Sequence, residues 1–147
     1  MTGTVNPDRI NQKMADVKEA LTTLEEYAKL PDADFLHNRE RIRSARYSFI
    51  ILAEAATNIA GHICARIFDK APVTYGDSFS ILAENNVLDQ SLAARLGKMV
   101  GLRNLLVHRY ETIDDRKMLE IMRNDLGNFR TYLHNIARYL SREGSEI

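Results

Sequence analysis

The sequence of 147 residues has one cysteine, no net charge and no long apolar run. Cys64 cannot form an internal disulfide, and the histidines show no H-x-x-x-H spacing that would indicate a zinc site. Because 20 basic side chains balance 20 acidic ones, no overall field draws the protein to nucleic acid or to membranes. Disulfide-scaffold, redox and zinc-dependent classes are therefore disfavoured, and any basic surface must be local.

Segments that direct a chain to or across a membrane are also missing. The first residues, MTGTVNPDRINQK, have neither the basic start nor the apolar stretch of a signal peptide. The longest strongly apolar run, Phe49 to Ala53, ends at Glu54, far short of the roughly 20 residues that a membrane span needs. We expect a cytoplasmic protein without a membrane partner. Its 45% apolar and 27% charged residues predict one folded domain over residues 1–147.

Patterns of β-strands are absent too, since no stretch alternates with period two for long enough. Apolar residues instead recur at intervals of three and four near both ends of the chain, which predicts amphipathic helices. The two stripes are Ile10, Met14, Val17, Leu21, Leu24 and Ala28, and Leu119, Met122, Leu126, Phe129, Leu133, Ile136 and Leu140. Asn6 and Pro7 suit the start of the first helix, and Pro31 should end it.

The middle of the chain predicts the remaining helices. Residues 34–68 contain no proline and read as one long helix, followed by a loop at DKAPVTYGDS. Asp77 and Asp89 can cap two further helices, the second of which runs toward His108, and the last helix should begin near residues 112–115. The sequence predicts an all-α, up-and-down bundle of four to five helices.

Three polar residues interrupt the apolar middle helix. Glu54, Asn58 and His62 follow one another at intervals of four and therefore share one face. A carboxylate within an apolar helix is costly unless it is paired, so Glu54 should face an arginine, a cleft or a subunit interface. The alternative is that this face is simply exposed to solvent.

A group of arginines precedes these residues. Arg39, Arg43 and Arg46 are spaced by four and three and should project together. Guanidinium groups suit phosphate or carboxylate recognition because each offers a planar fork of donors. Since Glu40 lies among them, an ordinary solvated face is the alternative.

The stretch RNLLVHRY, residues 103–110, gathers several reactive side chains near a predicted helix end. At about 100° per residue, Asn104 and His108 share a face, and Tyr110 lies almost above Arg103. Arg103 and His108, by contrast, point about 140° apart. They can reach one phosphate only if the arginine wraps around, the helix is distorted near Gly101, or a second copy supplies a partner. The last option predicts a symmetric dimer.

These side chains suit RNA cleavage without a metal. A histidine near its reference pKa of about 6.5 can take a proton from a 2′-hydroxyl or give one to the leaving oxygen. An arginine can stabilise the charge that develops on the phosphoryl oxygens. Asn104 could orient the imidazole or the phosphate, and Tyr110 could bind a base or carry a modification. Alternatively, His108 is a structural residue at a helix end.

RNLLVHRY resembles the R-x-x-x-x-H-x-Y motif of the HepT-like toxins, a branch of the HEPN superfamily of α-helical domains. The segments ERIRSARYSFIILAEAATNIAGHI and YGDSFSILAENNVLDQSLAARLGKMVGLRNLLVHRYETID are also similar to the family, so the resemblance covers most of residues 8–140.

The resemblance implies a metal-independent endoribonuclease, the toxin of a toxin–antitoxin pair, that acts as a homodimer with facing motifs. Arg103 and His108 would be catalytic. Tyr110 would receive AMP from an MntA-type minimal nucleotidyltransferase antitoxin, which uses the ATP; this chain itself needs no cofactor. The residues expected to support catalysis or bind RNA are Asn104, Glu54, Arg43 and Arg46.

Two other functions fit the same sequence. The chain could be a non-catalytic nucleotide- or protein-binding module that forms a complex with a nucleotidyltransferase, or a purely structural dimerisation subunit. RNA cleavage in the presence of a chelator would separate the ribonuclease from both.

Overall fold

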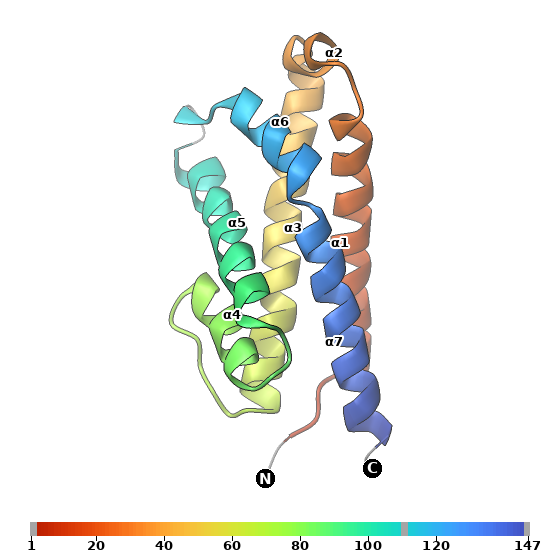
Figure 1. Cartoon of the computed structure of the whole chain (residues 1–147), viewed down its shortest axis with the longest axis vertical. Coiled ribbons are helices and arrows are strands. Elements are labelled where there is room, and N and C mark those ends of the chain that lie inside the picture. The colour runs from red at the N-terminus through yellow and green to blue at the C-terminus, as the bar shows by residue number, and fades with distance from the viewer. Residues whose placement is uncertain (1–2, 110–111, 146–147) are drawn as a thin grey trace.

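The computed structural model describes residues 3–109 and 112–145 and is built from α-helices there (Figure 1). The helices are α1 (Pro7–Ala28), α2 (Asp32–Leu36), α3 (Arg39–Arg66), α4 (Tyr75–Glu84), α5 (Gln90–His108), α6 (Asp115–Asn124) and α7 (Gly127–Ser145). The described segments contain no strand. The predicted all-α bundle is confirmed.

Three long helices form the body of the bundle. α1 packs most extensively against α3, and α7 packs against α1 and α5 (Figure 1). α5 runs antiparallel to α3 on its other side, with the short α4 beside its lower half. α6 crosses the upper end near α2, while both chain termini lie at the lower end. The interface of α3 and α5 therefore extends along most of the molecule.

The core is centred on α3, whose apolar side chains are buried on more than one face. Its fully buried residues include Phe49, Leu52, Ala56, Ile59 and Ile63. α3 is long and apolar enough to cross a membrane, but 56% of its apolar stretch is buried inside the bundle. Packing within the protein thus accounts for the composition of this helix.

A buried tyrosine ties three helices together. The hydroxyl of Tyr132 on α7 donates a hydrogen bond of 2.8 Å to the carbonyl of Ala56 on α3. Its ring meets the edge of Phe79 on α4 at a centroid distance of 5.6 Å. Cys64 lies in the same core, where burial raises the pKa of its thiol to about 11. This cysteine is therefore protonated and unreactive at neutral pH.

Helix starts follow the capping residues of the sequence, with one difference. Asn6 accepts from the backbone N–H of Arg9 at 3.2 Å before Pro7 opens α1, and Asp89 caps α5. The cap of α4 is Thr74 rather than Asp77. Asp77 is instead the third helical residue, and its carboxylate accepts from the Thr74 N–H to complete a capping box.

Two predicted helices are each divided, which raises the number of helices above four or five. The expected helix over residues 34–68 breaks after Leu36, because Asn38 accepts from the N–H of Arg41 at 3.0 Å and starts α3. The last expected helix breaks between Asn124 and Gly127. Apolar spacing continues across both breaks, so periodicity alone does not reveal them.

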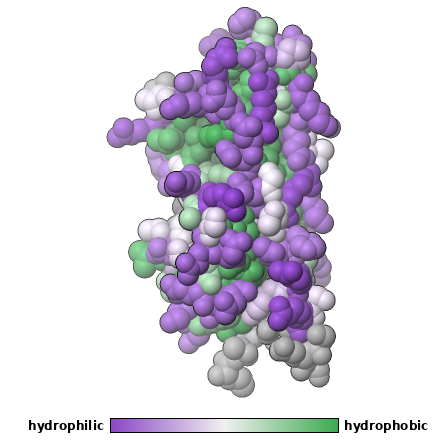
Figure 2. Space-filling view, viewed as in Figure 1, coloured by the Kyte–Doolittle hydropathy of each residue, from purple (hydrophilic) through white to green (hydrophobic). Residues whose placement is uncertain are grey.

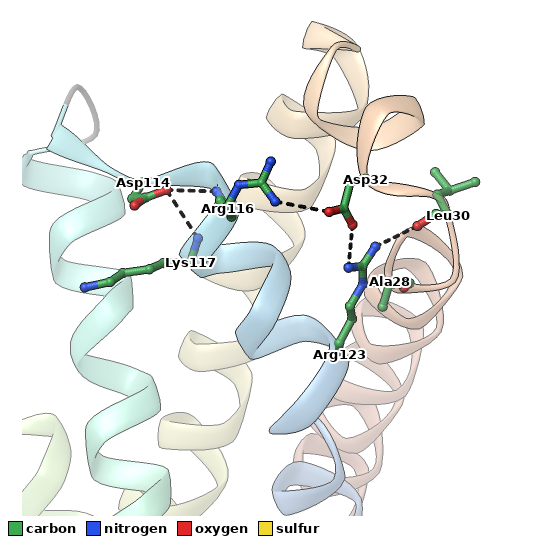
Figure 3. Close-up of polar contacts among 7 residues, drawn as sticks. All are labelled: Ala28, Leu30, Asp32, Asp114, Arg116, Lys117 and Arg123. Atoms are coloured by element: carbon green, nitrogen blue, oxygen red, sulfur yellow. Dashed lines mark hydrogen bonds and ion pairs between the residues drawn. The ribbon is translucent and has the colours of Figure 1, made fainter.

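An ion cluster fixes the upper end of the bundle (Figure 3). Asp32 accepts from Arg116 at 3.1 Å and from Arg123 at 2.6 Å. Arg123 also donates to the carbonyl of Ala28, the last residue of α1, and to that of Leu30 just beyond it. The Asp32 cluster, defined as Asp32, Arg116 and Arg123, thus joins α6 to the α1–α2 connection.

Candidate active site

Arg103 projects from α5 onto α3. Its Nη2 lies 2.7 Å from Oε1 of Glu54, and its Nε lies 3.3 Å from the same oxygen. The side chain of Arg103 is only 16% exposed, while that of Glu54 is 42% exposed. Glu54 therefore faces an arginine, one of the three arrangements expected from the sequence. The pair holds the guanidinium group in a defined orientation at the surface between the two helices.

Asn104 extends this contact along α5. Its Oδ1 accepts from Nη1 of Arg103 at 3.3 Å, so the arginine is held both from α3 and from its own helix. That Asn104 orients the imidazole of His108 stays a prediction; the contact observed for Asn104 is to Arg103.

His108 is the final residue of α5 and is exposed. The helix ends there because Arg109 leaves the helical region, with φ −142° and ψ 42°, while its N–H still reaches the carbonyl of Leu105. An exposed imidazole at a helix end can exchange protons with a bound substrate. Tyr110 lies outside the described residues.

The geometry of α5 separates the two candidate catalytic residues. Arg103 is largely buried against α3, whereas His108 is exposed five residues farther along. α5 is a continuous helix from Gln90 to His108, so no break at Gly101 turns them toward each other. Two of the three ways in which Arg103 and His108 could reach one phosphate therefore remain: the long arginine side chain wraps around the helix, or a second copy supplies a partner.

Asn58 and His62 each have a partner from the start of the chain. Oδ1 of Asn58 accepts from Nη2 of Arg9 at 2.7 Å, and Nε2 of His62 accepts from the backbone N–H of Asn6 at 2.9 Å. Burial, followed by the charges of Arg9 and Arg66, lowers the pKa of His62 below 6.5. Asn58 and His62 on this face of α3 therefore form hydrogen bonds with the start of the chain, and the face is not simply exposed to solvent.

A cleft of about 690 Å³ lies next to these residues, between α3, α4 and α5. We call it the α3–α5 cleft. Its lining residues are Arg9, Thr57, Asn58, Gly61, His62, Ala65, Pro72, Val73, Thr74, Gly76, Ser78, Gly97, Val100, Gly101 and Asn104. Asn104 belongs both to the cleft and to the contact with Arg103. The cleft thus begins directly beside the candidate catalytic arginine.

Arg43 and Arg46 lie toward the other end of α3. α3 and α5 run in opposite directions (Figure 1). Arg43 and Arg46, which precede Glu54 on α3, therefore lie toward the same end of the bundle as His108, which follows Arg103 on α5. Arg46 forms an ion pair of 2.8 Å with Asp115 on α6, and Arg43 is exposed. Neither lines the α3–α5 cleft. Their role in RNA binding stays a prediction, and for Arg46 the structure adds a contact that stabilises the fold.

Sequence reasoning missed several cleft residues. Arg9 enters from the first turn of α1, and Thr74 from the loop before α4. Glycines at positions 97 and 101, one turn apart on α5, were a usable signal, because glycine weakens a helix unless its small size is needed. No spacing in the sequence could have placed Arg9 beside Asn58, since 49 residues separate them.

Apolar residues are also exposed near the motif. Figure 2 shows a mostly hydrophilic face with apolar side chains gathered near the gap between α5 and α6. The exposed large apolar residues of the described chain are Tyr47, Val73, Leu105 and Val107. Leu105 and Val107 lie on the last turns of α5, between Arg103 and His108, with 46% and 41% of their surface exposed.

Known proteins are similar to this chain in sequence. The chain is 36% identical over 80 residues to the mRNA nuclease HepT of Shewanella oneidensis, a match that covers 54% of this chain and 60% of that protein. It is 24% identical over 136 residues to the tRNA nuclease HepT of Aphanizomenon flos-aquae, with 92% of each chain covered. The matched segment therefore spans less than two thirds of the Shewanella protein but nearly all of the cyanobacterial one.

Solved structures agree with the sequence matches. A tri-AMPylated Shewanella oneidensis HEPN toxin in complex with an MNT antitoxin aligns with a TM-score of 0.81 and 29% identity, over 89% of this chain and 98% of that one. The model of the ribonuclease HepT-like family matches residues 17–136, which include α3, every lining residue of the α3–α5 cleft except Arg9, and the motif of α5. With its helical bundle and its motif at the end of α5, the chain belongs to the ribonuclease HepT-like family.

Proposed function

We propose that this protein is an endoribonuclease, the toxin of a prokaryotic toxin–antitoxin pair, and that it cleaves RNA without a metal ion. The observation that carries the proposal is the placement of Arg103, held by Glu54 at 2.7 Å, five residues before an exposed His108 at the end of α5. The nuclease names of the HepT relatives support it.

The reaction divides between these two residues. The 2′-oxygen of the RNA attacks the neighbouring phosphorus, and the bond from phosphorus to the 5′-oxygen breaks. His108 either takes the proton of the 2′-hydroxyl or gives one to the departing 5′-oxygen, and water accepts or supplies the other proton. Arg103 stabilises the charge on the non-bridging phosphoryl oxygens, and Glu54 keeps its guanidinium group oriented.

A homodimer would complete the site. Arg103 and His108 occupy different faces of α5, so a second copy can place its His108 opposite the first copy's Arg103. The exposed Leu105 and Val107 lie between them and supply apolar surface for such a contact. A two-fold arrangement would bring the same helix together from both chains.

The partner is an MntA-type nucleotidyltransferase antitoxin that silences the toxin by AMPylation of Tyr110, using ATP. A related toxin is tri-AMPylated in its complex with an MNT antitoxin, which supports the proposal. Each added AMP would place negative charge and bulk two residues from His108, where RNA must bind. A reaction of this kind fits a cytoplasmic location.

RNA cleavage in the presence of EDTA tests the catalytic proposal. We expect His108→Ala to lower kcat/KM by about 10²- to 10⁴-fold, the usual contribution of a general acid or base. His134→Ala, which removes an exposed histidine of α7, is the matched control and should leave the rate unchanged. Cleavage at the original rate by His108→Ala would overturn the assignment, and absence of cleavage by the wild type would favour a binding module.

Intact mass spectrometry tests the silencing proposal. After co-expression with the nucleotidyltransferase, the toxin should gain mass in units of AMP. Tyr110→Phe should abolish the gain, whereas Tyr47→Phe, which changes a tyrosine that is 66% exposed, should retain it. An inactive complex without added mass would instead indicate that the antitoxin blocks the toxin sterically.

A further inference from the structure

The α3–α5 cleft offers many hydrogen-bond donors and no carboxylate. Among the described residues, its lining includes Arg9, His62 and two asparagines, Asn58 and Asn104, but neither aspartate nor glutamate. The oxygens of both asparagines are already used by Arg9 and Arg103, which leaves their amide N–H groups for a ligand. The cleft therefore suits a ligand that is rich in acceptors or negatively charged.

His62 adds a further donor. Because Nε2 accepts from the N–H of Asn6, the neutral ring carries its proton on Nδ1. Burial and the nearby Arg9 and Arg66 keep the pKa of His62 low, so this tautomer persists at neutral pH. Arg9, which lines the cleft, and Arg66, whose charge acts on His62, place positive charge near this end of the cleft in a protein whose net charge is zero.

Glycines keep the cleft open. Gly61 on α3 and Gly101 on α5 both line it, and a Cβ added at either position would meet no atom within 4 Å. Inside a helix, glycine is about 0.5 to 1 kcal/mol less favourable than alanine. Packing does not demand glycine at these two positions. Their effect is to leave unfilled space in the cleft.

The position of the cleft indicates its occupant. Asn104 lines the cleft and contacts Arg103, so a ligand in the cleft lies next to the phosphate that Arg103 would bind. A volume of about 690 Å³ falls within the usual range of small-ligand sites and accommodates a nucleotide. We propose that the α3–α5 cleft binds one nucleotide of single-stranded RNA adjacent to the cleaved bond, a proposal that rests on the proposed ribonuclease function.

In this subsite the residues of the cleft bind the RNA and do not carry out the cleavage. Arg9 contacts a backbone phosphate, while the amides of Asn58 and Asn104 bind the acceptor groups of the base. Arg9 and Asn58 take no part in proton transfer, so loss of their contacts with RNA raises KM and leaves kcat nearly unchanged.

Filling the cleft tests the proposal. Gly61→Leu places a side chain in the open space, and Gly127→Leu is the matched control, because position 127 is also open but lies outside the cleft. In a His108→Ala background, fluorescence anisotropy with a labelled single-stranded decaribonucleotide measures Kd. We expect Gly61→Leu to raise Kd about tenfold and Gly127→Leu to leave it unchanged. With His108 intact, Gly61→Leu should raise KM for cleavage by a similar factor.

A second variant keeps the test valid if Gly61→Leu does not fold. Asn58→Asp introduces a carboxylate into the cleft next to Arg9, where an ion pair can form without loss of the helix. We expect it to raise Kd severalfold. Circular dichroism and thermal unfolding establish that each variant is folded.

The outcomes separate the subsite from the catalytic proposal. An unchanged Kd in both folded variants, with RNA cleavage intact, would overturn the subsite and leave the ribonuclease function in place. Weaker RNA binding in a wild type that never cleaves RNA would support the subsite and overturn the catalytic proposal. Loss of nucleotidyltransferase binding by Gly61→Leu, with RNA affinity unchanged, would assign the cleft to the protein partner instead.

Discussion

Two arginine–carboxylate pairs join helices at nearly equal distances, yet their surroundings differ. Arg103 lies 2.7 Å from Glu54, and Arg123 lies 2.6 Å from Asp32. Arg123 also donates to two backbone carbonyls, and Asp32 binds a second arginine. Arg103 instead adjoins an asparagine that lines an open cleft. The distance within an ion pair does not distinguish a structural arginine from a functional one; the groups around the pair do.

In the Asp32 cluster, both arginines form ion pairs with the one carboxylate. Two arginines hold the pKa of Asp32 below its usual value, mainly through the hydrogen bond from Arg123. The cluster connects α6 to the end of α1, and none of its three residues lines the α3–α5 cleft. We therefore assign the Asp32 cluster to stability, whereas the proposed function assigns the Arg103–Glu54 pair to the reaction. Substitutions in the two pairs should separate these effects.

The largest expected effect is that of Arg103→Lys on cleavage. Lysine keeps the charge but lacks the planar fork that contacts Glu54 through Nε and Nη2. We expect kcat/KM to fall by about 100-fold or more, as for loss of one transition-state donor. Arg123→Lys is the control and should leave cleavage unchanged. Equal activities of the two variants would remove the distinction between the pairs.

The next effect is that of Arg123→Ala on stability. This change removes hydrogen bonds of 3.1 and 2.8 Å to the carbonyls of Ala28 and Leu30. We expect the free energy of unfolding to fall by about 1 to 2 kcal/mol, measured by urea denaturation. The kcat/KM of the folded protein should not change. A loss of activity without a loss of stability would place the cluster in the functional site.

Glu54→Gln should produce a smaller effect on catalysis than Arg103→Lys. Glutamine can still accept a hydrogen bond from Arg103, but it no longer fixes the guanidinium group by charge. We expect kcat to fall about tenfold, which corresponds to about 1.4 kcal/mol. Since the Glu54 side chain is 42% exposed, the urea midpoint should change little. Asp32→Asn, the equivalent change in the other pair, should affect only the midpoint.

The sequence was sufficient for the helices but not for their breaks. Apolar residues at intervals of three and four predicted the stripes that pack in the core, including Leu21 and Phe129. Asn6 and Asp89 were visible as caps because their side chains act within one turn. The cap at Asn38 lies within a stretch without proline that reads as one helix, where helical propensity cannot show that the chain changes direction.

The candidate site was predicted in part. The spacing of Arg103 and His108 is local to one helix, so their divergence followed from helical geometry. That Glu54 meets an arginine could be expected from the cost of an unpaired carboxylate, but not that the partner is Arg103. The α3–α5 cleft depends on three helices and the start of α1, and no local pattern encodes that assembly.

The smallest expected effect is a difference in pH dependence between the two regions. The pKa of His62 is lowered from 6.5, so the unfolded chain binds a proton more readily than the folded one. Its contribution to stability is therefore present above pH 6.5 and is lost as the pH falls toward the folded value. The pKa of Asp32 is lowered from 3.8, so its contribution persists at pH 5 and is lost only as the pH falls through its folded value.

Urea unfolding between pH 7 and pH 5 should thus show a loss of less than about 1 kcal/mol at His62, on the scale of one exposed hydrogen bond. His62→Gln should reduce this loss because glutamine gains no proton, whereas Asp32→Asn should retain it. An identical pH dependence in His62→Gln and the wild type would show that the hydrogen bond from Asn6 does not link the histidine to folding.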